Sequence, residues 1–240
     1  MPATPTAPTA ADPLTEIVNL PANWQPLGGF DTRTAEALVR ICRGRTIKDS
    51  METGAGKTTL LLSHLSERHT VFAMDHKGSL RKTIESPLLK PGVVTTVEGP
   101  TQLTLPKHTF PRLQFALFDG PHAYPFPDLE YYHVYPHIDA GGLMLIDNID
   151  IPSIHNLYQF AKADRMWRLL EVVSVTAFFE RTDAPTFDPL GGPWRDQGYN
   201  ARKVVLDRSL KGRLSRLASA VAKVTPGPVR RAVKRVLGKK

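Results

Sequence analysis

The sequence predicts an α/β protein with a mostly parallel, doubly wound sheet that is closed by a C-terminal antiparallel pair of strands. Three observations lead to this fold class. Short apolar runs alternate with segments of helical periodicity, several of these runs end in Asp or Glu, and their lengths suit buried strands. Such alternation is typical of a Rossmann-like domain, in which ligands bind beyond the carboxyl ends of the strands. We therefore expect a single domain with its binding site at that edge of the sheet.

The expected elements follow one another along the chain in this alternating order. Five strands are expected at residues 47–52, 71–75, 93–99, 115–120 and 141–148. Helices are expected at residues 31–44, 57–67, 79–89, 127–139 and 154–163. Asp31 or Thr32 could cap the first helix, and Gly44 would end it. Residues 167–181 and 200–208 are expected to pair as the closing antiparallel strands.

The segments on either side of this domain differ from it in composition. Residues 1–13 are rich in Pro, Thr and Ala, which predicts a disordered leader, and residues 14–208 would form the α/β domain. Of 31 Lys and Arg residues, eleven lie in the stretch from Arg208 to Lys240, which leaves 20 elsewhere against 23 Asp and Glu. The net charge of +8 therefore comes from a basic tail, residues 209–240, and does not indicate nucleic-acid binding by the domain.

The basic tail has Leu and Val at helical spacing, with basic residues on the other face. Two short basic amphipathic helices, separated by the breaker TPGP, would suit attachment to an anionic membrane surface. A protein surface is the second alternative. Nucleic acid is the third, because no aromatic residues are interleaved for base stacking. A solvated extension without a partner is the simplest interpretation.

Three features predict a cytoplasmic protein, located at the inner membrane surface if the tail binds there. No apolar run is long enough for a transmembrane helix, and the first residues lack the basic and apolar regions of a secretory signal. The single cysteine, Cys42, excludes an internal disulfide. It lies in a polar segment without a cysteine partner, and we expect it to be structural rather than nucleophilic.

The stretch METGAGKTT, residues 51–59, is similar to two kinds of ligand-binding loop. Gly56, Lys57 and Thr58 fit the second half of a P-loop, which would indicate an NTPase or a kinase. The first glycine of that motif falls on Met51, whose side chain disfavours the positive φ that glycine accepts. The P-loop is therefore one essential residue short.

A dinucleotide-type loop, G-x-G-x-x-G, is the second interpretation. Gly54 and Gly56 supply its first two glycines, and Thr59 stands where the third belongs. The surroundings strengthen this interpretation, because Glu52 precedes the loop and Asp75 follows 19 residues after Gly56. An acid that binds a ribose diol is expected at about that distance. An ordinary tight strand-to-helix turn is the alternative without a ligand.

Two groups of motifs, in the right order, resemble one known family. The stretch ETGAGKTTLLLSHLSERHTVFAMD, followed by FALFDGPHAY and DAGGLMLIDNID, is similar to class I S-adenosylmethionine-dependent methyltransferases. The most similar branch is that of bacterial small-molecule and sugar O-methyltransferases, and the resemblance covers roughly residues 35–208. It implies a Rossmann-like fold, S-adenosylmethionine (SAM) as the cofactor and methyltransferase activity. GAGKT is then a chance partial P-loop.

The resemblance also implies a site for the methyl donor. Glu52, Gly54 and Gly56 would form the loop under the methionine part of SAM. Asp75 would accept hydrogen bonds from the ribose hydroxyls, and Glu98 would lie beside the adenine.

A second set of polar residues follows two later strands. Asp119 ends one apolar strand, and Asp147 and Asn148 end the next. Because these strands should be neighbours, three oxygen ligands would converge, and Mg²⁺ prefers carboxylate and amide oxygens. The set resembles metal-dependent O-methyltransferases, in which the ion orients hydroxyls of the acceptor and lowers the pKa of one of them. In the alternative without a metal, Asp119 contacts the amine of SAM and Asp147 caps a helix.

His122, three residues after Asp119, is the candidate catalytic base. Methyl transfer is a direct displacement that mainly requires alignment and proton removal, and a neutral imidazole could accept the proton of the attacking hydroxyl. A loop histidine bonded to backbone is the alternative. Residues 185–200 are rich in Gly and Pro and could cover the site with Trp194 and Tyr199.

The sequence thus predicts transfer of a methyl group from SAM to a hydroxyl of a small molecule, sugar or glycoconjugate, with or without Mg²⁺. An NTPase or kinase that uses GAGKT and a non-catalytic protein of the methyltransferase fold are the alternatives. The C-x-x-C and H-E-x-x-H spacings of zinc sites and the G-x-S-x-G motif of hydrolases are absent from the sequence.

Overall fold

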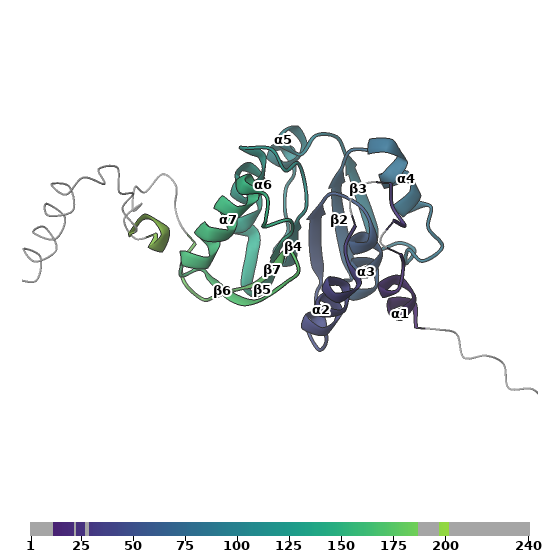
Figure 1. The fold of residues 1–240 in the computed structure, drawn as a ribbon, viewed down its shortest axis with the longest axis horizontal. Helices are drawn as coiled ribbons and strands as arrows, with labels where there is room; N and C mark the ends of the chain where they lie inside the picture. The colour runs from purple at the N-terminus through teal and green to yellow at the C-terminus, as the bar shows by residue number, and fades with distance from the viewer. Residues whose placement is uncertain (1–11, 22, 27–28, 187–196, 202–240) are drawn as a thin grey trace, which may run out of the picture. The chain divides into compact units, whose positions relative to one another are not determined.

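A seven-stranded sheet in the order β3-β2-β1-β4-β5-β7-β6 lies at the centre of the computed structural model (Figure 1). The structure describes residues 12–21, 23–26, 29–186 and 197–201. By its internal contacts the chain divides into two units, residues 1–199 and residues 200–240, and the sheet belongs to the first. The expectations for the basic tail and for Trp194 concern residues outside the described ranges.

Strands and helices alternate along the first unit, as the sequence predicts. The strands are β1 (Asp49–Thr53), β2 (Arg68–Ala73), β3 (Val94–Glu98), β4 (Leu113–Phe118), β5 (Ile138–Ile146), β6 (Trp167–Val173) and β7 (Thr176–Arg181). The α-helices are α1 (Pro13–Val18), α2 (Thr32–Cys42), α3 (Lys57–Leu65), α4 (Ser79–Ile84), α5 (Thr101–Thr104), α6 (Phe126–Val134) and α7 (Pro152–Ala163). Short 3-10 turns are η1 (His76–Gly78), η2 (Leu105–Lys107), η3 (Tyr135–His137) and η4 (Gly198–Ala201).

The pairing of the strands confirms the predicted fold class. The pairs β1–β2, β1–β4, β2–β3 and β4–β5 are parallel, whereas β7 is antiparallel to both β5 and β6. The strand order reverses direction between β1 and β4. In doubly wound sheets a ligand-binding crevice opens at such a reversal, beyond the carboxyl ends of the strands.

The closing antiparallel pair differs from the expected one. The sequence suggests that residues 167–181 pair with residues 200–208, but residues 167–181 alone supply both β6 and β7. The chain turns back at Ser174, whose φ of 52° lies in the left-handed region that tight turns use. Residues 202–208 lie outside the described ranges, and within those ranges β7 is the strand that joins the hairpin to β5.

Prolines explain why two helices end before the expected positions. α4 ends at Ile84, because Pro87 disfavours a helical conformation at Ser86. α6 ends at Val134 and passes into the turn η3, which contains Pro136. These boundaries leave the order of elements unchanged.

Aspartate caps start the first two helices. The Asp12 carboxylate accepts a hydrogen bond from the Leu14 N–H, so α1 begins where the sequence predicts the end of a disordered leader. Asp31 caps α2, since its Oδ1 accepts a hydrogen bond from the Thr34 N–H at 2.9 Å. Cys42 ends α2 inside the core, and burial raises the pKa of its thiol to about 12. The thiol is therefore protonated at neutral pH and does not act as a nucleophile there.

The central strands are buried on both faces. In β4, Phe115 and Leu117 point into one apolar core, and Ala116 and Phe118 point into the other. The first core includes side chains of α1, α2 and α3, and the second includes side chains of α6 and α7. A strand buried on both faces appears as a continuous apolar run, which is the pattern of FALF in the sequence. Within the described ranges, no helix combines the length and the apolar character needed to cross a membrane.

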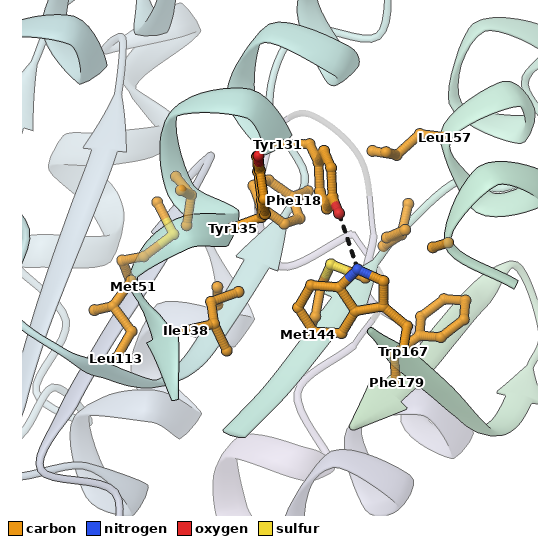
Figure 2. Close-up of a cluster of buried hydrophobic side chains, with 14 of the residues drawn as sticks. Met51, Leu113, Phe118, Tyr131, Tyr135, Ile138, Met144, Leu157, Trp167 and Phe179 are labelled. Carbon is orange, nitrogen blue, oxygen red and sulfur yellow. Dashed lines mark hydrogen bonds between the residues drawn. The ribbon is translucent and has the colours of Figure 1, made fainter. Parts of the chain in front are cut away.

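Aromatic side chains fill the core beneath α6 and α7 (Figure 2). Tyr131 and Tyr135 stack with ring centroids 4.8 Å apart. The Tyr131 hydroxyl accepts a hydrogen bond from the buried Trp167 Nε1–H at 2.9 Å, which pairs a donor that would otherwise cost about 1–3 kcal/mol to bury. The aromatic stretch YYHVY therefore packs on the sheet mainly through these two tyrosines, while Tyr132 is exposed.

Candidate active site

A cavity of about 570 Å³ opens at the carboxyl ends of the five parallel strands. This volume falls within the range of roughly 300–1,000 Å³ that is common for small-molecule sites. Its walls come from the segment before α2, the turn after β1, the segments after β2 and β3, and the ends of β4 and β5. Of the residues that the sequence analysis singles out, it includes Gly54, Asp119, His122, Asp147 and Asn148.

Gly54 is the point where the turn after β1 meets the end of β4. Its φ is +91°, and its N–H donates a hydrogen bond to the Phe72 carbonyl at 2.9 Å. A Cβ at this position would lie 2.6 Å from the carbonyl oxygen of Asp119. Only glycine meets both requirements, and its backbone therefore faces the cavity without a side chain.

Glu52 supports the loop from inside the protein and does not line the cavity. Its carboxylate is fully buried, and Oε2 accepts a hydrogen bond from Thr58 Oγ1 at 2.5 Å. Oε1 accepts a hydrogen bond from Thr59 Oγ1 and lies 3.1 Å from His69 Nε2. Thr59 Oγ1 in turn accepts the Gly56 N–H at 3.0 Å. The carboxylate therefore fixes the first turn of α3 to β1.

Lys57 binds the segment before α2 and is not available for the phosphate of a nucleotide, as a P-loop lysine would be. The residue is buried, and its Nζ donates to the carbonyls of Leu20 at 3.2 Å and Phe30 at 3.4 Å. Its backbone N–H donates to Gln25 Oε1 at 3.0 Å, so a side chain already occupies the helix N-terminus that would bind an anion. A Cβ on Gly56 would meet the same Gln25 oxygen at 1.9 Å. This geometry does not support the NTPase alternative.

Asp75 and Glu98 lie beside the cavity, although neither lines it. Asp75 follows β2 by two residues, and its Oδ1 accepts a hydrogen bond from the Arg81 N–H at 3.2 Å, while the preceding Met74 faces the cavity. Glu98 is exposed at the end of β3, and the next residue, Gly99, lines the cavity. Contacts of these two acids with a donor therefore stay predictions.

Asp119 and His122 form a charge pair in the cavity wall after β4. His122 Nε2 lies 3.5 Å from Asp119 Oδ1, and the two side chains are 43% and 30% exposed. Burial raises the pKa of Asp119, and the contact with His122 partly opposes this effect. The contact with Asp119 also raises the pKa of His122 above 6.5, although partial burial of the imidazole lowers it. The carboxylate thus increases the affinity of the imidazole for a proton.

Asp147 and Asn148 lie at the end of β5, beside the end of β4. The Asp147 N–H donates to the Phe118 carbonyl at 3.1 Å, and its carboxylate accepts a hydrogen bond from Thr176 Oγ1. Burial raises the pKa of Asp147 to about 7, and the nearby charge of Asp119 adds to the increase. Asn148 has a left-handed φ of 56°.

Asp119, Asp147 and Asn148, from which a magnesium site is expected, lie in the wall of one cavity. In the part of the chain that the structure describes, no three His, Cys, Asp or Glu side chains are grouped so as to hold a metal ion. Each carboxylate already has a protein partner, His122 for Asp119 and Thr176 for Asp147. Asn148 would have to complete the site with the two carboxylates, and Mg²⁺ at these residues stays a prediction from the sequence.

Glu130 is a buried acid that the sequence analysis does not single out. It is on α6, only 2% exposed, and its Oε2 accepts a hydrogen bond from Thr53 Oγ1 at 2.8 Å. Burial raises the pKa of Glu130 to about 7, although the hydroxyls of Thr101 and Thr53 favour its charged form. A glutamate in a helix is usually exposed to solvent, and no motif in the sequence indicates that this one is buried. Only the fold shows that this side of α6 faces the protein interior.

Tyr199, which the sequence analysis places over the site, is not among the residues that line the cavity. Its ring packs edge-on against Phe160 of α7, with the centroids 5.9 Å apart. The contact of Tyr199 with an acceptor is therefore not supported by its position.

Comparisons with known proteins agree with this fold. Residues 51–149 match a family described as a methyltransferase domain. The chain is 10% identical to the O-methyltransferase TomG from Streptomyces achromogenes in complex with SAM, with a TM-score of 0.57 over 72% of this chain and 91% of that one. A proposed O-methyltransferase from Klebsiella pneumoniae is 15% identical, with a TM-score of 0.54 over 74% and 91%.

A third solved structure extends the likeness. The methyltransferase from Podospora anserina bound to S-adenosylhomocysteine (SAH) is 15% identical, with a TM-score of 0.53 over 72% of this chain and 88% of that one. No curated protein matches the chain. Identities this low establish a shared fold and do not identify a substrate.

We expect Lys57→Met to destabilise the protein without affecting any ATP binding. The substitution keeps the volume of the side chain but removes the Nζ–H bonds to Leu20 and Phe30, which leaves their carbonyls without this donor. The free energy of unfolding in urea should fall by about 1–3 kcal/mol. Lys48→Met, on the exposed surface, is the matched control and should change it by less than about 0.5 kcal/mol. ATP binding that disappears in Lys57→Met would restore the P-loop interpretation.

We expect Glu130→Gln to stabilise the protein more at pH 8 than at pH 4.5. The ordinary pKa of the glutamate is 4.5 and burial raises it to about 7, so the folded state keeps a proton that the unfolded chain loses in this window. The free energy of unfolding of the wild type therefore falls as the pH rises from 4.5 to 7, by up to roughly 3 kcal/mol, and the glutamine does not titrate. Urea denaturation at both pH values measures the difference. An equal effect at the two pH values would show that the carboxyl is ionised in the folded protein.

Proposed function

Because the chain has the class I SAM-dependent methyltransferase fold, we propose that it transfers a methyl group from SAM to a hydroxyl oxygen of a small molecule. One observation carries the proposal. A single cavity contains the bare backbone of Gly54 and, from the next strand of the sheet, the Asp119–His122 pair. The first suits the donor, and the second suits an acceptor that must lose a proton.

The donor half of the cavity is built from backbone and small residues. Gly54 packs its backbone closely against the end of β4, and residues 99–102 form a wall directly after Glu98, the residue that the family resemblance places beside the adenine. Gln25 and Phe30 close the side next to α3. When bound, SAM supplies a sulfonium methyl group that an oxygen nucleophile can displace. The fixed turn held by Glu52 means that little reorganisation is needed when the donor enters.

The acceptor half of the cavity contains the base. In its neutral form His122 accepts the proton of the acceptor hydroxyl as the oxygen attacks, and Asp119 stabilises the imidazolium that results. Asp147 holds a proton in part of the molecules near neutral pH, so it can donate a hydrogen bond to the acceptor. No step of this proposal depends on a metal ion.

Donor binding is tested by calorimetric titration with SAH and, separately, with ATP, each with and without Mg²⁺. We expect SAH to bind and ATP not to bind. Gly54→Ala should weaken SAH binding at least about ten-fold, because its Cβ would lie 2.6 Å from the Asp119 carbonyl oxygen and displace the turn. Lys48→Met serves again as the control. Binding of ATP alone would overturn the proposal, and binding that requires Mg²⁺ would restore the metal site.

We expect His122→Gln to abolish most turnover while donor binding persists. Transfer of labelled methyl from SAM to a panel of phenols and sugars should fall by about 10²–10⁴-fold, the usual contribution of a general base. The affinity for SAH should stay within about two-fold, since the imidazole acts on the acceptor. In the wild type the rate should rise with pH as His122 loses its proton, at a pH above 6.5.

Unchanged turnover in His122→Gln would exclude His122 as the base. SAH binding without transfer to any compound of the panel would favour a non-catalytic protein.

A further inference from the structure

Glu130 is linked by hydrogen bonds to the segment that carries the proposed base. Its Oε2 accepts a hydrogen bond from Thr53 Oγ1 at 2.8 Å. The same Thr53 oxygen accepts the backbone N–H of Asp119 at 3.1 Å. One buried hydroxyl, at the last residue of β1, therefore connects the side chain on α6 to the backbone just after β4.

The second oxygen of Glu130 packs against the same segment. A Cβ on Gly120 would lie 2.0 Å from Glu130 Oε1, so the carboxylate occupies the space beneath the glycine backbone. Glu130 and His122 also border one small void of about 10 Å³ under the loop. Among the described residues, Glu130 Oε1 and Thr101 Oγ1 both lack a hydrogen-bond partner of acceptable geometry, although Thr101 is close enough to favour the charged form of the acid. The hydrogen-bonded link through Thr53 and the packing against Gly120 therefore both act on residues 119–122.

Apolar packing alone does not explain a carboxylate at this position. The site is buried among apolar residues such as Phe118, Ile154 and Leu157, where a methionine or leucine would fill the volume without the cost of burying a charge. One of the two carboxylate oxygens is also left without a hydrogen bond. Groups that cost stability in this way are concentrated at functional sites.

We propose that Glu130 is a positioning residue that fixes the segment 119–122, and with it the His122 imidazole, through Thr53 and through the packing of its carboxylate beneath Gly120. The proposal rests on the proposed function, in which His122 removes the proton of the acceptor. Glu130 does not line the cavity proposed for the donor and the acceptor. Its effect therefore falls on the placement of the base, and a base displaced by about 1 Å loses on the order of 10²-fold in rate.

Glu130→Ala tests the proposal. With the best acceptor of the phenol and sugar panel, kcat should fall about 10- to 100-fold, while the affinity for SAH stays within about two-fold. Glu130→Gln should keep kcat within about three-fold, because its amide has the same shape and its carbonyl can accept the Thr53 hydroxyl. Tyr132→Ala, on the exposed side of the same helix, is the matched control and should leave kcat unchanged.

Thr53→Val separates the hydrogen-bond link from packing. Valine has nearly the same shape as threonine but cannot join Glu130 to the Asp119 N–H. It should lower kcat by less than Glu130→Ala does, because the carboxylate still packs beneath Gly120, and the double variant should lose no more than Glu130→Ala alone. Additive losses would show that the two residues act independently and would overturn the link.

Amide hydrogen exchange at Asp119, Gly120, His122 and Ala123 provides a readout that needs no acceptor. Exchange should be faster than in the wild type in Glu130→Ala and Thr53→Val, and nearly unchanged in Glu130→Gln and Tyr132→Ala. If the wild type transfers no methyl group, the proposed function fails, and the exchange rates still decide whether Glu130 fixes the segment. Unchanged exchange and unchanged kcat in folded Glu130→Ala would overturn the positioning role. A parallel loss of SAH affinity and kcat would also do so, because it would assign Glu130 to the donor site.

Discussion

The fully buried carboxylate of Glu52 joins β1 to the first turn of α3 and to β2. It accepts hydrogen bonds from Thr58 and Thr59 and faces His69, so all three neighbours help to offset the cost of its burial. Thr59 passes the constraint on by accepting the Gly56 N–H. The turn after β1 is therefore held from inside the protein, and Gly54 presents its backbone to the cavity. Everything that the donor half of the cavity offers depends on this arrangement.

The opposite half of the cavity depends on a shortage of positive charge. Asp119, Asp147 and Glu130 each have a raised pKa, and His122 is the one cation that all three share in the described structure. Acids this close do not all ionise together at neutral pH, so their protons belong to the group rather than to single residues. A positively charged sulfonium beside them would be favoured, and so would the imidazolium that forms when His122 takes up a proton. The same electrostatics thus suit both reactants of the proposed reaction.

The sequence predicts the fold well because its signals come from burial and chain order. Apolar runs such as FALF are long enough to reveal strands buried on both faces, and the alternation with helices leaves few other topologies. The hairpin within residues 167–181 is not anticipated, because a single serine with a left-handed φ has no clear sequence signature. Tertiary contacts decide such turns, and they are not visible in local composition.

The sequence places several polar residues that follow strands near one cavity, but it does not reveal residues that reach the cavity wall from elsewhere. Asp119, His122 and Asp147 follow strand ends, and the structure brings them into one cavity. Asp75 also follows a strand, yet its carboxylate is bonded to α4 instead. Glu130 is not predicted, because its burial comes from the contact of α6 with the end of β1, which no spacing in the sequence expresses.

The segment before α2 is attached to α3 beside the cavity. Its attachment and the binding of a ligand in the cavity can therefore depend on each other. Lys57 binds the carbonyls of Leu20 and Phe30, Gln25 accepts its backbone N–H, and both Gln25 and Phe30 border the cavity. By linkage, any ligand of the cavity that favours the attached segment is itself bound more tightly, by the same factor, when the segment is attached. A cleavage that frees this segment would therefore also weaken the binding of any such ligand.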